Sequence, residues 1–243
     1  MDCLEVLEAP PLRGSSSGST PALPPFRYNA DMKFSTLFFD LDATLYPGSS
    51  GLWQALKSRI HRFMEQQLGL PKEEIDPLRQ QYYHQYGTTL SGLMRHHQVD
   101  PREYLTYVHD IDLENYISYS PRLKEILSSL PQSLWVFTNA DRPHAERVLK
   151  ILQLEKTFSG IVDIHALDFL VKPEPGAYRR ALALAGLESP AGCVLFDDLS
   201  QNLPPANRMG FFTVLVNEES TTNQADLHIS SLHDLPQKMP YLW

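Results

Sequence analysis

Two kinds of hydrophobic pattern alternate along most of the chain. Short runs of consecutive apolar residues, as in Leu134-Trp135-Val136-Phe137, predict buried β-strands. Longer stretches with an apolar residue at every third or fourth position predict amphipathic helices. The expected strands cover residues 34–39, 134–138, 160–164, 193–197 and 211–216, and a shorter apolar segment at 227–229 is a candidate edge strand.

The expected helices fall into two groups. One group is uninterrupted by any strand pattern and covers residues 52–68, 72–96, 101–109 and 121–130. The other alternates with the later strands and covers residues 143–153, 174–186 and 201–209, with a small terminal helix near 232–235. Strand–helix alternation is typical of a parallel sheet covered by helices. The pattern therefore predicts an α/β fold, a Rossmann-like parallel sheet core with an inserted all-helical cap.

The domain organisation follows from where the helical block lies. It separates the first expected strand from all the others, so residues 34–47 and 131–243 are expected to form the α/β core and residues 48–130 the cap. Residues 1–33 are expected to be a flexible tail, because they include a Gly/Ser-rich stretch followed by a Pro-rich one. A transit peptide is the alternative for this tail, although the acidic residues Asp2, Glu5 and Glu8 argue against it.

Composition and charge exclude several classes of partner. The chain has 243 residues, 42% of them hydrophobic, and a formal net charge of -8. Nucleic acids and anionic membranes attract cationic surfaces, so neither is an expected partner. No apolar stretch approaches the ~20 residues of a membrane-spanning helix. Two cysteines, Cys3 and Cys193, cannot form a disulfide framework, and Cys193 lies in an expected core strand. We expect a cytoplasmic protein, with organelle targeting by the tail as the alternative.

Candidate chemistry is concentrated in four short polar segments that follow or end expected strands or lie between them. They are Asp40-Leu41-Asp42-Ala43-Thr44, Thr138-Asn139, Lys172-Pro173 and Asp197-Asp198. Open α/β sheets bind their ligands at the carboxyl ends of their strands. Each segment alone is explained by an ordinary surface turn, cap or loop. Their joint occurrence at successive strand ends predicts one active site.

The residue types suit phosphoryl transfer. In an extended segment Asp40 and Asp42 point the same way, so one carboxylate can attack phosphorus while the other protonates the leaving oxygen and later activates water. A divalent cation is needed to offset their repulsion of a phosphate, and hard oxygen ligands point to Mg²⁺. Asp197 and Asp198 are the natural further ligands. Lys172 supplies positive charge, Thr138 supplies a hydroxyl, and the helix that begins near Pro143 directs backbone N–H groups to the same region.

At these residues the chain resembles the phosphohydrolases of the haloacid dehalogenase (HAD) superfamily. The four segments resemble its motifs I to IV in order, and the helical block lies where that superfamily has its C1 cap. Leu45-Tyr46-Pro47, Phe137-Thr138-Asn139-Ala140 and Gly87-Thr88-Thr89-Leu90 are most similar to the pyrimidine 5′-nucleotidase subgroup of plants and fungi. The resemblance covers residues 34–243.

The resemblance implies a role for each motif residue. Asp40 would be the nucleophile and a Mg²⁺ ligand, and Asp42 the general acid/base that also gives its backbone carbonyl to the metal. Thr138 and Asn139 would bind the phosphoryl group and Lys172 would stabilise it. Asp198, assisted by Asp197, would hold the metal. The chain departs from the subgroup at two positions, where Ala43 replaces Asn or Asp and Leu199 replaces a frequent Ser.

The expected function is Mg²⁺-dependent hydrolysis of a small phosphomonoester through an aspartyl-phosphate, with a pyrimidine nucleoside 5′-monophosphate as the leading substrate. The alternatives are a sugar phosphate or another phosphorylated metabolite, a non-catalytic regulatory protein of the same fold, a phosphotransferase and a dehalogenase. Asp42 argues against dehalogenation, which needs no general acid. Substrate choice is expected to depend on the cap, whose candidate contacts are Tyr82, Tyr83, His84, Tyr86, Arg95, His96 and His97. For each of them, packing within the cap or exposure to solvent is the plainer interpretation.

Overall fold

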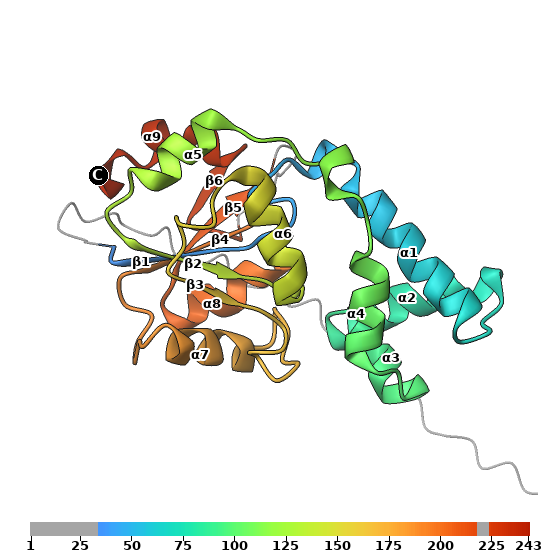
Figure 1. Cartoon of the computed structure of the whole chain (residues 1–243). Helices are drawn as coiled ribbons and strands as arrows, with labels where there is room; N and C mark the ends of the chain where they lie inside the picture. Colours follow the sequence, from blue (N-terminus) through green and yellow to red (C-terminus); the bar gives the residue numbers. More distant parts are fainter. Residues whose placement is uncertain (1–33, 218–223) are drawn as a thin grey trace, which may run out of the picture.

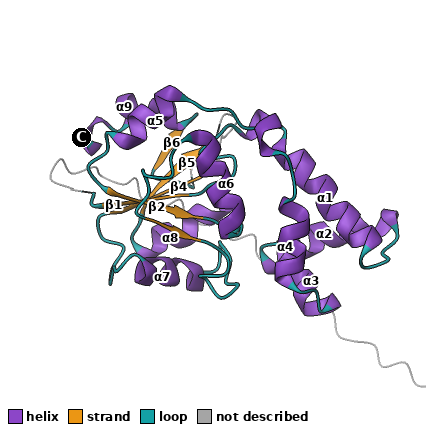
Figure 2. Cartoon of the chain, in the orientation of Figure 1, coloured by secondary structure: helices purple, strands orange, loops and turns teal. Residues whose placement is uncertain are grey.

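A six-stranded parallel sheet forms the centre of the molecule (Figures 1 and 2). We describe it from a computed structural model, which covers residues 34–217 and 224–243; the expected tail at 1–33 lies outside these residues. The strand order is β3-β2-β1-β4-β5-β6. The strands are β1 (Thr36–Phe39), β2 (Ser133–Phe137), β3 (Gly160–Val162), β4 (Cys193–Asp197), β5 (Phe212–Val216) and β6 (Leu227–Ile229). This sheet confirms the predicted α/β fold, including the edge strand.

Helices follow the strands or form the block between β1 and β2. The block contains α1 (Leu52–Gln66), α2 (Lys72–Tyr86), α3 (Thr89–His97), α4 (Pro101–His109) and α5 (Pro121–Ser128). The later helices are α6 (Arg142–Leu152), α7 (Pro175–Leu184), α8 (Leu203–Met209) and α9 (Leu235–Lys238). Short 3₁₀ turns lie at Gly48–Ser50, Leu113–Asn115, Ser200–Asn202, Leu232–Asp234 and Pro240–Leu242.

Alternate residues of each strand face opposite layers of helices. In β1, Leu37 and Phe39 pack in the cluster that contains α5, α6 and α9, whereas Phe38 packs in the cluster that contains α7 and α8. The other strands divide in the same way, because side chains alternate with a period of two along a strand. With both faces covered, the strands read as continuous apolar runs rather than as alternating ones. Cys193 is buried in the second cluster, as its position in an apolar run predicted.

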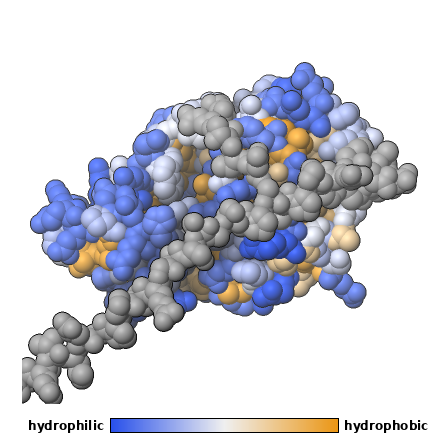
Figure 3. Space-filling model, turned by 180° about the vertical axis from the view of Figure 1, so that it is seen from behind, coloured by the Kyte–Doolittle hydropathy of each residue, from blue (hydrophilic) through white to orange (hydrophobic). Residues whose placement is uncertain are grey.

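The helices α1 to α4 lie beside the sheet rather than on either of its faces (Figure 1). We call residues 48–116 the helical insert. Figure 3 shows a mostly hydrophilic outer surface over this region in the view from behind, with a small apolar patch. Within the part of the chain that is described, no helix is long and apolar enough to cross a membrane.

Two features of the helical block differ from the expectations. The stretch predicted as one helix at 72–96 is divided, because Gly87 takes a left-handed φ of 82° and Thr88 caps α3 by accepting a hydrogen bond from Ser91 N. The fifth helix, α5, packs beside the C-terminal segment: Ser120 Oγ lies 3.0 Å from His233 Nε2, and Trp243 Nε1 donates to Ser129 Oγ at 2.8 Å. These contacts place α5 with the helices that cover the sheet. The expected cap, residues 48–130, therefore includes α5 in addition to the helices α1 to α4 that lie beside the sheet.

The order of the strands brings the four polar segments to one edge. β1 lies between β2 and β4, so the chain leaves β1 in one direction toward β2 and later returns on the other side at β4. Such a reversal opens a crevice at the carboxyl ends of the strands. Asp40 directly follows β1, Thr138 directly follows β2, and Asp197 ends β4. The predicted site residues therefore meet at this crevice.

Candidate active site

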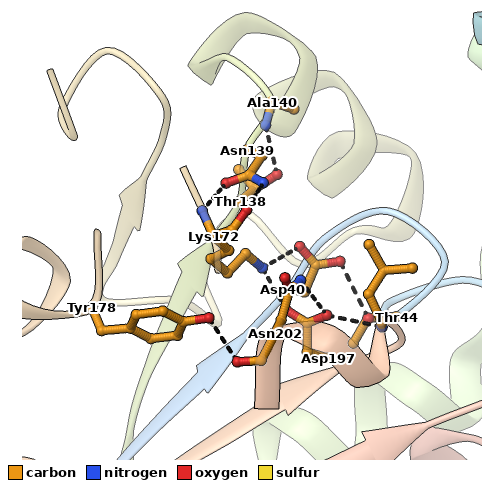
Figure 4. A network of polar contacts seen from close by, with 10 residues as sticks. Asp40, Thr44, Thr138, Asn139, Ala140, Lys172, Tyr178, Asp197 and Asn202 are labelled. Atoms are coloured by element: carbon orange, nitrogen blue, oxygen red, sulfur yellow. Dashed lines mark hydrogen bonds and ion pairs between the residues drawn. The ribbon is translucent and has the colours of Figure 1, made fainter. Parts of the chain in front are cut away.

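A buried lysine joins two of the predicted carboxylates (Figure 4). Lys172 Nζ lies 2.7 Å from Asp40 Oδ1 and 2.6 Å from Asp197 Oδ2. All three side chains are almost entirely enclosed, and Lys172 is 1% exposed. An ammonium group removed from water in this way needs paired anions, and the two carboxylates supply them. The structure thus brings together residues from the ends of β1 and β4 and from the loop before α7.

Asn139 fixes the backbone of Lys172. Its Oδ1 accepts a hydrogen bond from Lys172 N at 2.9 Å, and its Nδ2 donates to Lys172 O at 3.1 Å. The next peptide bond, Lys172-Pro173, is cis. Both polar atoms of the Asn139 side chain are thus paired with the backbone of Lys172, and the expected role of Asn139 in binding a phosphoryl group stays a prediction. Asn139 still lines the cavity described below.

Asp197 is fully engaged by the protein. Besides the bond from Lys172, its Oδ1 accepts hydrogen bonds from Leu199 N at 3.0 Å and Asn202 Nδ2 at 2.9 Å. Asn202 is held in turn by Tyr178, whose hydroxyl donates to Asn202 O at 2.6 Å. The Asp197 side chain is fully enclosed, and it does not line the cavity. These contacts suit a residue that positions Lys172 better than a direct metal ligand.

Two threonines close the same region. Thr44 Oγ1 donates to Asp40 Oδ2 at 3.3 Å, so each oxygen of Asp40 has a partner. Thr138 Oγ1 accepts a hydrogen bond from Ala140 N at 3.0 Å. That bond leaves the hydroxyl hydrogen of Thr138 available as a donor. Because Thr138 also lines the cavity, its hydroxyl is placed to meet an anionic oxygen there.

Asp42 has partners that the sequence reasoning missed. Its Oδ1 accepts a hydrogen bond from the Tyr46 hydroxyl at 2.6 Å and lies 2.8 Å from His144 Nε2. Tyr46 lies four positions after Asp42 in the chain, and His144 lies in the first turn of α6. The sequence predicted a helix start near Pro143 beside the site, which was the available signal, but only backbone N–H groups were considered there.

The pKa values of these carboxyl groups diverge because their surroundings differ. Burial raises the pKa of Asp40 to about 7 despite the Lys172 charge, and the Asp197 charge adds to the rise. Burial, with the charges of Asp40 and Asp197, raises the pKa of Asp198 to about 9. Burial also disfavours the Asp42 carboxylate, but His144 and Tyr46 outweigh it and lower its pKa to about 2. Asp197 and Asp40 hold the pKa of Lys172 above its ordinary value, although burial opposes this.

The donor set fits a hard divalent cation. Asp40 and Asp198 both line the cavity, and their pKa values are raised first by burial and then by the charges of neighbouring carboxylates. In the described part of the chain, no three His, Cys, Asp or Glu side chains surround a common point. A set built from Asp40, Asp198 and the backbone carbonyl of Asp42 has only two such side chains, and water completes Mg²⁺ sites of this kind.

A cavity of about 700 Å³ lies between the site and the helical insert. Its sheet side includes Asp40, Asp42, Thr138, Asn139, Lys172 and Asp198. Its insert side is mainly apolar or aromatic, with a few polar groups; it includes Trp53, Leu56, Ile60, Arg79, Gln80, Tyr83, Tyr104, Leu105 and Val108. An enclosure of this size and composition suits the remainder of a small organic phosphate.

Of the expected substrate contacts in the insert, only Tyr83 lines this cavity. Gln201 Nε2 donates to its hydroxyl at 2.6 Å, which links α2 to the loop after β4. His84 is exposed, and the other five pack in the α2–α3 region: the Tyr82 hydroxyl lies 3.0 Å from His97 Nε2, the Tyr86 hydroxyl lies 2.8 Å from His96 Nε2, and Arg95 lies over the Tyr86 ring. The sequence reasoning missed Trp53, Arg79 and Tyr104, because helical periodicity does not identify which face of α1, α2 and α4 borders the site.

Comparison with known proteins identifies the relatives of this chain. Residues 34–210 match the family model described as haloacid dehalogenase-like hydrolase. Phosphate metabolism protein 8 of Saccharomyces cerevisiae is 29% identical over 233 residues, which cover 90% of this chain and 73% of the yeast protein.

Solved structures share the fold at lower identity. A HAD phosphatase from Thermococcus onnurineus matches with a TM-score of 0.58 and 21% identity, covering 84% of this chain and 96% of that one. L-2-haloacid dehalogenase from Xanthobacter autotrophicus, with chloropropionic acid covalently bound, matches with a TM-score of 0.55 and 13% identity, covering 84% and 97%. Because phosphatases and dehalogenases both match, the fold does not decide the reaction, and the site residues must.

Proposed function

The chain belongs to the haloacid dehalogenase-like hydrolases, and from that premise we propose that it is a Mg²⁺-dependent phosphohydrolase that acts through an aspartyl-phosphate on Asp40. The observation that carries this proposal is that the site contains two carboxylates in different surroundings. Asp40 is buried against the Lys172 ammonium group, and Asp42 is held by His144. Both carboxyl groups line the same cavity, so one can attack phosphorus while the other exchanges a proton with the leaving oxygen. A dehalogenase has no step that uses the second carboxyl group.

In the first step, an oxygen of Asp40 attacks the phosphorus of the ester. A new bond forms between Asp40 and phosphorus, and the bond from phosphorus to the ester oxygen breaks. Lys172 and the Thr138 hydroxyl stabilise the charge on the phosphoryl oxygens. Asp42 gives a proton to the departing oxygen, and the negative charge of the bound phosphate raises the pKa of Asp42 from its low value so that it can carry this proton.

In the second step, water hydrolyses the aspartyl-phosphate. Asp42, now ionised, accepts a proton from the water as the water oxygen bonds to phosphorus. The bond between Asp40 and phosphorus breaks, which releases inorganic phosphate and restores the Asp40 carboxylate. Throughout, Asn139 holds the backbone of Lys172, and Asp197 holds its ammonium group.

Asp40, Asp198 and the backbone carbonyl of Asp42 would hold the Mg²⁺ ion. When bound, the ion neutralises charge between the carboxylates and the phosphate and so lets the two anions approach. Asp197 belongs to this arrangement as the partner of Lys172, because its oxygens are already paired within the protein.

A small phosphomonoester is the proposed substrate, with a pyrimidine nucleoside 5′-monophosphate as its leading member. The apolar wall formed by Trp53, Leu56 and Leu105 suits a flat base, and Arg79 and Gln80 offer polar contacts on the same side. The name of the yeast relative, a phosphate metabolism protein, agrees with phosphate chemistry. Sugar phosphates remain the alternative substrate class.

The test is kcat/KM for purified protein with Mg²⁺ across pyrimidine and purine monophosphates, sugar phosphates and other metabolite esters. We expect release of phosphate that needs Mg²⁺ and is abolished in Asp40→Asn, with a nucleoside monophosphate ranked first. If no nucleotide ranks near the top, the substrate assignment is wrong while the reaction stands. If the wild type releases no more phosphate than Asp40→Asn, the reaction assignment is wrong as well.

A further inference from the structure

The Asp42 carboxylate is held at one oxygen only. Both of its hydrogen-bond partners, the Tyr46 hydroxyl at 2.6 Å and His144 Nε2 at 2.8 Å, contact Oδ1. Asp42 is partly exposed and lines the cavity beside Asp40. Two donors on one oxygen fix the rotation of the carboxyl group. The other oxygen, Oδ2, has no hydrogen bond to any described residue, so it is the oxygen available to a substrate.

The His144 ring is completely enclosed, and its orientation is set by packing. Its side chain is 0% exposed, and its backbone N donates to Asp141 Oδ1 at 3.2 Å at the start of α6. The ring stacks on that of His109, with centroids 4.3 Å apart and planes 20° from parallel. The second ring nitrogen, Nδ1, is buried without a partner among the described atoms. Buried polar atoms are normally paired, so the contact of Nε2 with Asp42 is the hydrogen bond on which this enclosed ring depends.

His109 connects this arrangement to the helical insert. It is the last residue of α4, and its Nδ1 lies 2.8 Å from Asp141 Oδ1. Arg147 of α6 donates hydrogen bonds to His109 O, at 2.8 Å, and to Ile111 O. Asp141, His144 and Arg147 follow one another at three-residue spacing, so they share one face along the start of α6. On this face His144 contacts Asp42, and Asp141 and Arg147 contact the end of the helical insert.

We propose that His144 is the positioning residue for Asp42, and that its stack on His109 ties the orientation of Asp42 to the end of the helical insert. This inference rests on the proposed function, in which Asp42 protonates the leaving oxygen. His144 does not line the cavity, whereas Asp42 and His109 do, so His144 acts on the substrate through the residues that it contacts. Tyr46 shares the same oxygen and supports the same orientation from the loop after β1.

Esters with different leaving groups separate positioning from a general structural role. A nucleoside 5′-monophosphate has an alcohol leaving group that needs a proton, whereas the leaving group of p-nitrophenyl phosphate departs without one. The ratio of kcat/KM between the two esters therefore reports how well Asp42 is placed as an acid. A change that only loosens the fold lowers both values by the same factor.

The test compares His144→Leu, which keeps bulk but removes the donor, with His144→Gln, which keeps a donor at similar reach. We expect His144→Leu to lower kcat/KM about 100-fold for the alkyl ester and less than about fivefold for the aryl ester, and His144→Gln to recover about tenfold for the alkyl ester. His109→Leu should shift the ratio in the same direction by a smaller factor. His84→Leu, at an exposed position outside the cavity, is the matched control and should shift nothing.

Equal losses on both esters in His144→Leu would overturn the positioning role, and an unchanged ratio in His109→Leu would overturn the link to the insert. In an Asp42→Asn background, His144→Leu should produce no further change in the ratio. A spectroscopic test stands apart from activity: the imidazole ¹⁵N resonance of His144 should move in Asp42→Asn, and an unmoved resonance would contradict the proposal. If the wild type hydrolyses neither ester, the proposed function fails, and the resonance still decides whether His144 binds Asp42.

Discussion

Lys172 Nζ lies 2.7 Å from Asp40 Oδ1, although the two residues are 132 positions apart in the chain. The contact joins the end of the central strand β1 to the loop before α7. It also pairs the candidate nucleophile with a fixed positive charge that cannot move away, because Asn139 and Asp197 hold Lys172 from two other sides. Lys172 therefore favours the ionised form of Asp40 and opposes burial, which still raises the Asp40 pKa to about 7.

Replacing Lys172 by methionine should impair both activity and stability. The change leaves Asp40 and Asp197 buried without their cation, so we expect the free energy of unfolding to fall by about 3 kcal/mol at pH 8. Loss of the charge that stabilises the phosphoryl oxygens should lower kcat/KM by about 100-fold or more. Chemical denaturation and phosphate release measure the two effects. Lys150→Met, on the exposed end of α6, is the control and should leave both near the wild-type values.

Stability of the metal-free protein should fall as the pH rises from about 4 to 9. The pKa values of Asp40 and Asp198 are raised in the folded protein, to about 7 and about 9, so the folded state holds protons that the unfolded chain has released near pH 4. A state that holds more protons is favoured at lower pH, so stability falls wherever the unfolded chain is ionised and the folded state is not, and the fall ends near pH 7 for Asp40 and near pH 9 for Asp198. Mg²⁺ should offset the negative charge of the ionised Asp40 and Asp198 carboxylates and so raise Tm more at pH 9 than at pH 6.

Thermal unfolding with EDTA and with Mg²⁺ across this pH range measures the effect. His144, whose pKa is also raised, acts in the same direction, and His109, whose pKa is lowered by burial, acts in the opposite direction only below its ordinary range. Asp198→Asn separates these contributions and should flatten the dependence. A Mg²⁺ effect of equal size at all pH values would argue against binding at these carboxylates.

Ala43 should be a point of backbone strain. Its φ of 61° lies in the left-handed region, which costs an alanine more than a glycine. We expect Ala43→Gly to raise the free energy of unfolding by about 0.5–1 kcal/mol. Ala55→Gly, at the fourth residue of α1, should lower it by a similar amount because glycine weakens a helix. Destabilisation by both changes would contradict the strain.

Trp53 should contribute to substrate binding. It lies at the start of α1, is 57% exposed and lines the cavity next to the carboxylates. If its ring contacts the base, Trp53→Ala should raise KM for a nucleoside 5′-monophosphate about three- to tenfold with little change in kcat. Trp53→Phe should recover most of this loss. Arg95→Ala, whose side chain lies over Tyr86 outside the cavity, should leave KM unchanged, and a larger effect there would mean that another surface binds the base.

The sequence was sufficient for the sheet and for the motif residues. Fully buried strands are continuous apolar runs, and polar residues that follow such runs collect at one edge of a parallel sheet. For this reason Asp40, Thr138 and Asp197 could be placed together before the structure was known. The helical block was also evident, but its division at Gly87 depended on a left-handed residue and a threonine cap inside a continuous helical pattern.

Side-chain partners were less predictable. Asn139 had the right position for a phosphate contact, yet its amide pairs with the Lys172 backbone. His144 was hidden because its partner, Asp42, is 102 positions away and belongs to a different element. Trp53 and Arg79 could not be assigned to the cavity, since the packing of α1 to α4 beside the sheet decides which face of each helix borders it.

The central claim is that Asp40 carries the phosphoryl group between two steps, and that Asp42 acts as an acid in the first step and as a base in the second. The most direct measurement uses Asp42→Asn with p-nitrophenyl phosphate and Mg²⁺, because this ester needs no acid for the first step while the second step needs a base. We predict about one equivalent of p-nitrophenol released in a burst, and a phosphate on Asp40 found by peptide mass spectrometry after acid quench. A phosphate on any other residue, or hydrolysis of this ester by Asp40→Asn at the wild-type rate, would contradict the account.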